Sequence, residues 1–299
     1  SRRQRQMCIR DRDYGAGRVA VKSAGKQSRR TRTMDDKTRA LLGDHEAAKR
    51  LTDAGVLLEC KLIYGDCIDL MAGLPDDCVD FLFTDLPYGT TNCRWDTPID
   101  LNRFWHEAKR VVRKGGCKAL FAQTPFDKIL GCSNLNELRY EWIWEKTQAT
   151  GHLNAKKMPM KAHENILIFY DHLPTYNPQI THGHERKVST AAHKRNCRTG
   201  EVYHGYGKTG YDSTDRYPRD VLRGPSDKQK SCLHATQKPV WLCEQMILTY
   251  TNPEDTVLDC CMGSGSIGVA CLQNARKYIG MENDLAIFEV AKSRLEGAK

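Results

Sequence analysis

The sequence predicts an α/β fold, built on a doubly wound and mostly parallel sheet of seven strands. Apolar runs of strand length recur along the 299 residues, and several are continuous rather than alternating, as in strands buried on both faces. Segments with helical spacing of apolar residues lie between them. One run leads directly into a glycine-rich turn and a helix, which is typical of doubly wound sheets.

The predicted strands are rich in Val, Ile, Leu, Phe and Tyr, which favour a pleated and buried backbone. In chain order they cover residues 58–66, 79–85, 116–122, 140–146, 164–170, 255–260 and 277–282. Between the second and third strands, DLNRFWHEAKRVVRKGG has apolar residues at helical spacing and a glycine stop, which predicts a helix. A Thr-Gln-Lys-Pro turn predicts the start of another helix just before the sixth strand.

The strand and helix pattern breaks at Leu173 and resumes near Cys232, so we predict one domain over 51–299 with an irregular insertion at 172–233. Residues 181–232 hold 11 Lys and Arg against 6 Asp and Glu, with tyrosines interleaved. Such a segment has no core of its own, and its charge and aromatic rings suit contact with phosphates and bases. A solvated loop without function is the alternative.

The net charge of +9 comes from the start of the chain. Residues 1–50 hold 15 Lys and Arg against 6 Asp and Glu, whereas the remaining residues hold 31 of each. We expect this basic segment to be disordered or a non-native extension, with a DNA-binding tail as the alternative. No apolar run reaches the ~18 residues of a membrane span, so we expect no membrane contact.

The 13 cysteines are scattered, without a CxxC pair or a companion histidine at zinc-site spacing. We therefore expect reduced thiols and no metal site, in a cytoplasmic protein. His163 is likewise expected to be structural rather than a metal ligand.

The run FLFTDLPYG at 81–89 ends a strand in an acid, a proline and an aromatic residue. This arrangement suits attack by the exocyclic amine of a flipped nucleobase. Asp85 would accept one amine hydrogen and the carbonyl of Leu86 the other, while Pro87 fixes the backbone and Tyr88 stacks on the base. An ordinary strand-to-turn exit is the alternative, because Asp before a proline is common in turns.

The run DTVLDCCMGSGSIGVACL at 255–272 carries Gly263, Gly265 and Gly268 in the spacing GxGxxG between a strand and a helix. Such a loop lets the backbone approach a ligand closely. Glu282, at the end of the next strand, can accept hydrogen bonds from ribose hydroxyls. The pattern indicates a nucleoside cofactor and leaves a dinucleotide and S-adenosylmethionine open.

With DLPYG, the glycine loop and the TQKP turn together, residues 56–298 resemble the DNA amino-methyltransferases of bacteria and phages, which methylate adenine N6 or cytosine N4. DLPYG precedes the glycine loop, which is the motif order of the β class. The resemblance implies a Rossmann-like fold, S-adenosylmethionine as cofactor, double-stranded DNA as partner and target recognition by the inserted segment. It leaves open a homodimer and a cognate restriction endonuclease.

The resemblance also implies roles for individual residues. The implied catalytic residues are Asp85, Leu86, Pro87 and Tyr88, and the implied cofactor-binding residues are Asp66, Thr236, Lys238, Asp259, Met262, Gly263, Ser264, Gly265 and Glu282. Within the latter set, Asp66 would bind the adenine amine, Glu282 the ribose, and Thr236 and Lys238 the methionine end. For DNA contact we select Arg216, Arg219 and Arg223 of the insertion.

The chain departs from the family pattern at Leu86, Ala235 and Cys261, where the family usually has proline, proline and phenylalanine. An acid at the position of Asp85 is usual in the adenine enzymes, so the resemblance favours adenine N6, with cytosine N4 as the alternative. A nicotinamide-dependent oxidoreductase would use the same glycine loop but would leave DLPYG and TQKP without a purpose. A catalytically silent DNA-binding relative would lose the acid.

Overall fold

The computed structural model describes residues 60–90, 96–189, 211–227 and 237–298. The predicted basic tail at 1–50 lies outside these ranges, as does Thr236 of the predicted cofactor site. In the described part of the chain, no helix is long and apolar enough to cross a membrane.

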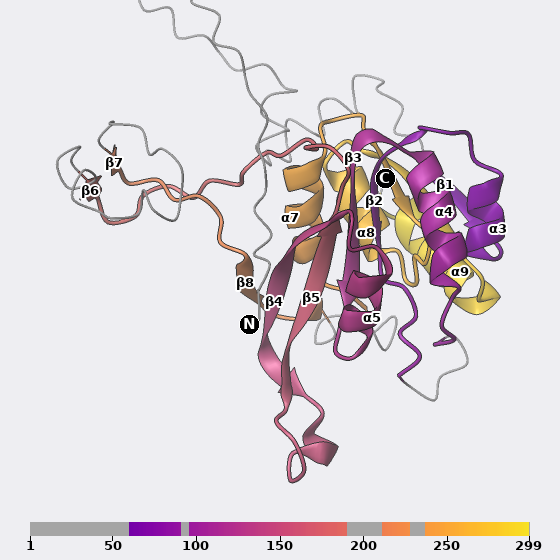
Figure 1. Cartoon of the computed structure of the whole chain (residues 1–299), viewed down its shortest axis with the longest axis horizontal. Coiled ribbons are helices and arrows are strands. Elements are labelled where there is room, and N and C mark those ends of the chain that lie inside the picture. Colours follow the sequence, from indigo (N-terminus) through magenta and orange to yellow (C-terminus); the bar gives the residue numbers. More distant parts are fainter. Residues whose placement is uncertain (1–59, 91–95, 190–210, 228–236, 299) are drawn as a thin grey trace, which may run out of the picture. The chain divides into compact units, whose positions relative to one another are not determined.

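The described residues form one eight-stranded sheet and a second sheet of two short strands (Figure 1). The strand order of the large sheet is β1-β10-β9-β2-β3-β5-β4-β8. Its strands are β1 (Cys60–Tyr64), β2 (Val79–Thr84), β3 (Val112–Ala122), β4 (Leu138–Thr150), β5 (Lys161–Phe169), β8 (Val221–Gly224), β9 (Thr256–Asp259) and β10 (Lys277–Glu282).

The five strands from β1 to β3 are parallel, and β5 runs antiparallel between β3 and β4. The predicted doubly wound, mostly parallel sheet is therefore confirmed. β9 pairs with β2 as well as with β10, although β2 and β9 lie far apart in the sequence. The two predicted functional loops therefore leave neighbouring strands at the carboxyl edge of the sheet, where ligands bind in folds of this type.

The prediction of seven strands was wrong by one, because β8 adds an eighth at the edge of the sheet. β8 lies inside the predicted insertion and pairs in parallel with β4, from Ile143 opposite Val221 to Lys146 opposite Gly224. Its four residues are too short and too exposed to be recognised from composition. They form a strand because the edge of β4 offers unpaired backbone groups.

Helices cover both faces of the large sheet. On one face, α7 (Val240–Tyr250), α8 (Ser266–Gln273) and α9 (Leu285–Glu296) pack over one apolar core, which includes Phe81 and Phe83 of β2. On the other, α3 (Cys67–Ala72), α4 (Leu101–Val111) and α5 (Phe126–Ser133) pack over a second core, which includes Leu82. Alternate side chains of β2 thus enter opposite cores, which fixes the register of the strand and the position of the residues after it.

The helix predicted from DLNRFWHEAKRVVRKGG is shorter than expected. α4 begins after Asp100, whose carboxylate accepts the backbone N–H groups of Asn102 and Arg103, and it ends at Val111. The predicted glycine stop belongs instead to β3, which starts at Val112. At Gly116 a Cβ would meet the Asp80 carbonyl oxygen at 2.9 Å, so this glycine permits close contact between two strands rather than ending a helix.

The insertion predicted at 172–233 is described over residues 172–189 and 211–227. These residues contain β8 and the two-stranded antiparallel sheet of β6 (Lys187–Ser189) and β7 (Tyr211–Ser213). The described part is therefore more regular than its composition predicts. Tyr203 and Tyr206, two of the tyrosines noted in the sequence, lie outside the described residues.

Candidate active site

A cavity of about 500 Å³ opens at the carboxyl edge of the parallel strands. Residues of both predicted loops line it, among them Asp85, Tyr88, Gly263 and Glu282, together with Lys238. A hydrogen bond joins the bases of the two loops: the hydroxyl of Thr84, the last residue of β2, donates to Asp259 Oδ1 at 2.9 Å. The fold thus brings to one cavity the predicted catalytic and cofactor residues that the structure describes, except Gly265, which does not line it.

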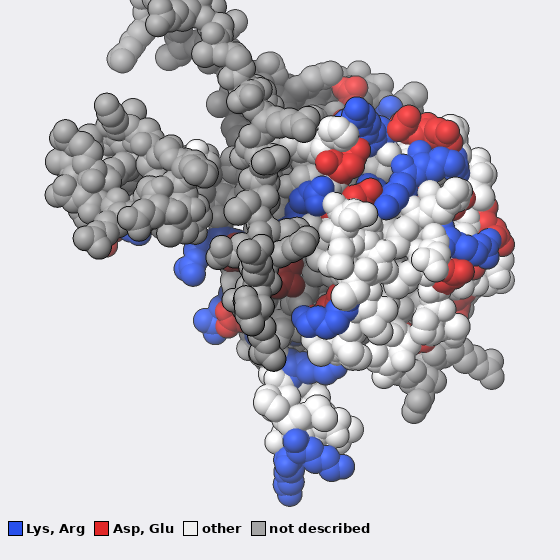
Figure 2. Space-filling model, in the orientation of Figure 1, with Lys and Arg blue, Asp and Glu red and all other residues white. Residues whose placement is uncertain are grey.

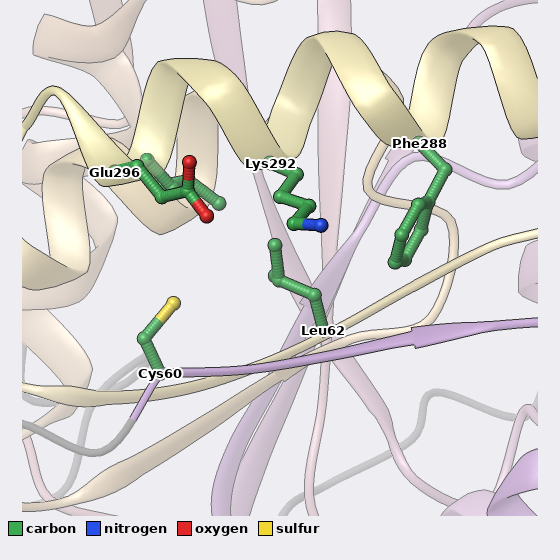
Figure 3. Close-up of a pocket in the computed structure, with 6 residues that line it drawn as sticks. Cys60, Leu62, Phe288, Lys292 and Glu296 are labelled. Carbon is green, nitrogen blue, oxygen red and sulfur yellow. The ribbon is translucent and has the colours of Figure 1, made fainter.

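A second hollow, of about 300 Å³, lies between β1 and α9 (Figure 3). Cys60 and Leu62 line it from the strand, and Phe288, Lys292 and Glu296 line it from the helix. None of the residues implicated by the sequence lies in it. The larger cavity is therefore the candidate active site.

The glycine loop is open to the cavity. Gly263 and Gly265 have φ values of +50° and +77°, in the left-handed region that favours glycine. A Cβ at Gly263 would meet nothing within 4 Å, so this backbone faces open space. At Gly268, in contrast, a Cβ would meet Tyr278 at 2.7 Å and Leu295 at 2.8 Å, so the third glycine allows close helix packing.

Two carboxylates of the cavity lie at the carboxyl ends of β10 and β1, the two strands beyond β9 in the sheet. Glu282 accepts the backbone N–H of Gly263 on Oε2 at 3.0 Å, and the N–H groups of Asn283 and Asp284 on Oε1. Asp66 accepts the N–H groups of Ile68 and Asp69 on one oxygen at the start of α3. A carboxylate oxygen has two lone pairs, so both side chains retain acceptor capacity toward a ligand in the cavity.

Asp259 holds the loop rather than presenting a free carboxylate. It is 1% exposed, and its two oxygens accept from Thr84 and from the Tyr278 hydroxyl, the latter at 3.2 Å. Burial raises the pKa of Asp259 to about 7, against the opposing effect of these hydrogen bonds. Met262 and Ser264 are also largely buried, and the Ser264 carbonyl accepts from the Arg294 guanidinium at 2.9 Å.

On the other loop, the Asp85 carboxylate has a partner on each oxygen. The Tyr88 hydroxyl donates to Oδ1 at 2.7 Å, and the Lys238 ammonium donates to Oδ2 at 2.5 Å. Burial, followed by the charge of Asp85, raises the pKa of the Tyr88 hydroxyl, which therefore remains a donor. The Tyr88 ring stacks on Phe126 with centroids 5.0 Å apart, which leaves only its opposite face for a base.

Lys238 extends this contact into a row of alternating charges. Its ammonium lies 3.3 Å from Glu164 Oε2, and Lys146 donates to Glu164 Oε1 at 2.5 Å. Burial disfavours the charge of Glu164, but the two lysines more than offset it and hold its pKa at about 2. Burial likewise opposes the charge of Lys238, and the carboxylates of Asp85 and Glu164 raise its pKa nevertheless. We call Lys146, Glu164, Lys238 and Asp85 the charge ladder.

Three residues of this site were not predicted from the sequence. Glu164 and Thr84 lie within predicted strands and gave no separate signal. Asp96 is 6% exposed and accepts the backbone N–H groups of Tyr88, Gly89 and Thr90 at 2.7, 2.8 and 2.9 Å. An acid eight residues after the aromatic residue, in a loop rich in small polar residues, was the only available sign of this contact.

The predicted cofactor contact of Lys238 stays a prediction, since its ammonium lies on the charge ladder. The neighbouring Gln237 is 5% exposed and lines the cavity, and its side-chain amide has no hydrogen-bond partner among the described residues. The Leu86 side chain is 2% exposed and anchors DLPYG in the second core. No described donor contacts its backbone carbonyl.

The three arginines selected for DNA contact differ in their surroundings. Arg216 donates to the carbonyl oxygens of Ser213, Asp215 and Glu185, which ties its guanidinium to the local backbone. Arg219 is exposed. Arg223 is also exposed, on β8, with Nε 3.5 Å from Glu145. The assignment of all three to DNA binding stays a prediction, with Arg219 and Arg223 the more accessible.

Comparison with known proteins gives matches over most of the chain. The model of the N6 and N4 DNA methylase family matches residues 79–293. Type II methyltransferase M2.MboI of Moraxella bovis is 26% identical over 253 residues, which cover 78% of this chain and 86% of that protein. DNA adenine methyltransferase YhdJ of Escherichia coli K12 is 26% identical over 251 residues, which cover 79% and 83%.

Two solved structures share the fold. M1.HpyAVI, solved in complex with S-adenosylmethionine, gives a TM-score of 0.54 at 23% identity and covers 79% of this chain and 98% of that one. The cytosine-N4-specific PvuII DNA methyltransferase gives 0.58 at 13% identity and covers 79% and 86%. The family match runs from the start of β2 into α9 and includes both loops of the cavity. The chain therefore belongs to the N6/N4 family of DNA methylases.

Proposed function

We propose that this protein transfers a methyl group from S-adenosylmethionine to the N6 amine of an adenine flipped out of double-stranded DNA. The observation that carries the proposal is the cavity that the two loops share. The hydrogen bond from Thr84 to Asp259 joins the two loops where they leave β2 and β9. A base held by Asp85 and a cofactor held by the glycine loop would meet there.

The cavity residues fit the proposed cofactor. The open space at Gly263 accepts a ligand against the backbone, and Glu282 is within reach of ribose hydroxyls bound beside that glycine. Asp66, at the start of α3, offers an acceptor for the adenine amine. When bound, S-adenosylmethionine supplies a methyl group on a positively charged sulfur, and transfer forms a nitrogen–carbon bond as the carbon–sulfur bond breaks. Binding and alignment are the tasks of the protein.

Asp85 and Leu86 would orient the target amine. The carboxylate of Asp85 would accept one amine hydrogen, and the carbonyl of Leu86, which has no partner among the described residues, would accept the other. Two acceptors fixed in this way draw the nitrogen lone pair out of the ring and toward the methyl carbon. Once the nitrogen–carbon bond has formed, the positively charged nitrogen releases one proton to water. Pro87 fixes φ of the chain after Leu86, which limits the motion of its carbonyl.

The charge ladder keeps Asp85 in place for this task. Lys238 is nearly buried between Asp85 and Glu164, so the position of its ammonium is set from both sides. The Tyr88 hydroxyl donates to the other oxygen of Asp85. Asp96 accepts backbone N–H groups from Tyr88 to Thr90 and so holds this part of the loop. We therefore assign Lys238 and Asp96 positioning roles on the base side of the cavity. An incoming amine would compete with Tyr88 or Lys238 for the carboxylate.

A basic hairpin supports contact with DNA at the same edge. β4 and β5 run past the end of β3, since Ala122, the last residue of β3, pairs with Asn165. Residues 147–163 beyond this point are all exposed and contain three lysines and no acidic residue. Figure 2 shows the positive charge gathered at the hairpin tip. Leu153, 88% exposed there, adds an apolar contact of the kind that inserts between base pairs.

The target atom is tested by its product. The purified protein is incubated with labelled S-adenosylmethionine and DNA of mixed sequence, and the digested nucleosides are resolved by mass. We expect N6-methyladenine, because an acid at Asp85 is usual in adenine enzymes. N4-methylcytosine as the sole product would show that the target is cytosine N4 and would leave the rest of the proposal intact. No methylated base on any DNA would overturn the activity.

A further inference from the structure

Three cysteines from two distant parts of the sequence meet in the fold. Cys67 is the first residue of α3, and Cys260 and Cys261 follow β9. Their three sulfur atoms all lie within 4.8 Å of one another. No other group of three or more Cys, His, Asp or Glu side chains among the described residues is close enough to hold a metal ion. We call these three residues the thiol cluster.

The spacing of the thiol cluster fits a thiophilic cation. Zinc bonds to cysteine sulfur at about 2.3 Å, so two sulfurs on one tetrahedral zinc ion lie about 3.8 Å apart. The cluster needs only small side-chain rotations to reach that spacing. Three sulfur ligands leave a fourth position for water, as in zinc sites with three protein ligands.

The thiol cluster is also accessible. All three cysteines line the cavity of about 500 Å³ that also contains Asp66 and Gly263. Cys67 and Cys260 are buried by the protein, and Cys261 is partly exposed. A hydrated ion can thus reach the sulfurs through the opening that the cofactor would use. By comparison, Cys117, Cys243 and Cys271 are fully buried and do not line this cavity.

We propose that Cys67, Cys260 and Cys261 form a binding site for Zn²⁺, and that zinc and S-adenosylmethionine exclude each other from the cavity. Zinc displaces the thiol protons and forms three zinc–sulfur bonds, with no change of oxidation state. The competition, which rests on the proposed function, follows from position. Cys67 adjoins Asp66, the proposed adenine ligand, and Cys260 and Cys261 lead directly into the glycine loop.

Zinc binding is tested on the reduced, metal-free full chain, by competition with a chromophoric zinc indicator. We expect one zinc ion per chain. Cys67→Ser and Cys261→Ser should each weaken binding by more than about 100-fold, because even changes in the residues behind metal ligands weaken binding by roughly 10- to 100-fold. The matched control is Cys132→Ser, on an exposed cysteine outside the cavity, which should bind zinc as the parent does.

Cd²⁺ gives a second readout, since its bonds to thiolates absorb in the ultraviolet, and this absorption should be lost in the Cys67 and Cys261 variants. Melting curves identify any variant that fails to fold, in which case the variant at the partly exposed Cys261 decides. An absence of zinc binding would overturn the proposal. Zinc binding that is unchanged in both variants would overturn it as well, because the ion would then lie elsewhere.

Competition is measured by calorimetric titration of S-adenosylmethionine, with and without one equivalent of zinc. We expect zinc to lower the apparent cofactor affinity at least ~10-fold in the parent and in Cys132→Ser, with recovery on adding a chelator. Equal cofactor affinity with and without bound zinc would overturn the exclusion. If the chain bound no S-adenosylmethionine even without zinc, the proposed function would fail, while the indicator titration would still decide on the zinc site.

Discussion

The two loops of the cavity are built in different ways. Around Asp85, the structure concentrates charge: four ionisable side chains form the charge ladder, and Tyr88 adds a hydroxyl. Around Gly263, the backbone provides the surface, with two glycines in left-handed conformations. The difference matches two tasks. An amine must be oriented by fixed acceptors, whereas a bulky cofactor needs clearance and a few hydrogen bonds.

Stability alone does not explain the charge ladder, since removing four charges from water carries a penalty that ion pairing offsets only in part. Apolar side chains in place of all four residues would fill the same space without that penalty. What the ladder provides is a carboxylate with a fixed direction at the end of β2. The glycine loop requires no such arrangement, because the proposed cofactor would be held there mainly through backbone and ribose contacts.

The largest effect is expected from removing the acid on the base side of the cavity. We expect Asp85→Ala to lower the rate of methyl transfer by at least roughly 10²- to 10³-fold, the range for losing one preorganised polar group. Affinity for S-adenosylmethionine, measured by calorimetry, should stay within a few-fold. Asp76→Ala, at an exposed acid paired with Arg110 and outside the cavity, is the control. Equal rates in Asp85→Ala and the parent would refute the assignment.

On the cofactor side of the cavity, a bulky side chain should exclude the cofactor. Gly263→Val projects a side chain into the open space of the cavity, so cofactor affinity should collapse while the sheet stays folded. Strain at a positive φ is a separate effect, and Gly183→Val controls for it, since Gly183 has φ +77° and nothing within 4 Å but does not line the cavity. Cofactor binding as strong in the Gly263 variant as in the Gly183 variant would show that the loop is not the cofactor site.

A substitution at Lys238 distinguishes a role in the charge ladder from a role in cofactor binding. If it serves the charge ladder, Lys238→Met should lower the transfer rate and leave cofactor affinity nearly unchanged. The fold should also lose about 3–5 kcal/mol, because the variant leaves buried carboxylates without their cation. Adding Glu164→Gln removes one of those charges and should restore part of the stability, which urea unfolding measures. A defect confined to cofactor affinity would instead support the contact with methionine implied by the family resemblance.

The raised pKa of Asp259 should make the free energy of unfolding depend on pH. Its pKa is about 7 in the fold and near 3.8 in the unfolded chain, so between these values the folded protein holds a proton that the unfolded chain lacks. The free energy of unfolding therefore falls as pH rises through this window, by at most about 1.4 kcal/mol per pH unit. Asp259→Asn should lack this fall. Parallel pH profiles of the two proteins in urea unfolding would contradict the shift.

The sequence predicted the sheet well because buried strands carry their own signal. The apolar runs that became β2, β5 and β10 lie within a few residues of their predicted bounds. The two loops were found by their unusual residues, Asp85 with Pro87 and the glycines at 263 and 265. Residues whose role depends on distant partners were not found. Thr84 looks like any polar residue in a strand, and its partner Asp259 is 175 positions away.

The same reason explains two further differences. β8 exists only because the edge of β4 is available to it, so its own sequence carries little signal. The cysteines were expected to be reduced thiols without a metal site, since zinc-site spacing is a local pattern in the sequence. Cys67 meets Cys260 and Cys261 only because β9 and β10 return beside β1. Glu164 and Lys238 are brought together similarly, from β5 and the turn before α7.

The smallest effects should come from the DNA-facing surfaces, because each exposed charge contributes separately. Lys156→Ala with Lys157→Ala, in the basic hairpin, should weaken DNA binding and flatten its dependence on salt, by up to about 0.9 in log–log slope for each phosphate that is no longer neutralised. Arg219→Ala with Arg223→Ala tests the insertion in the same way. The matched control is Arg103→Ala. Arg103 is an exposed residue of α4 that pairs with Asp69 of α3. A flatter slope in the lysine pair alone would make the hairpin the principal phosphate-binding surface, whereas unchanged slopes in both pairs would move DNA binding away from both surfaces.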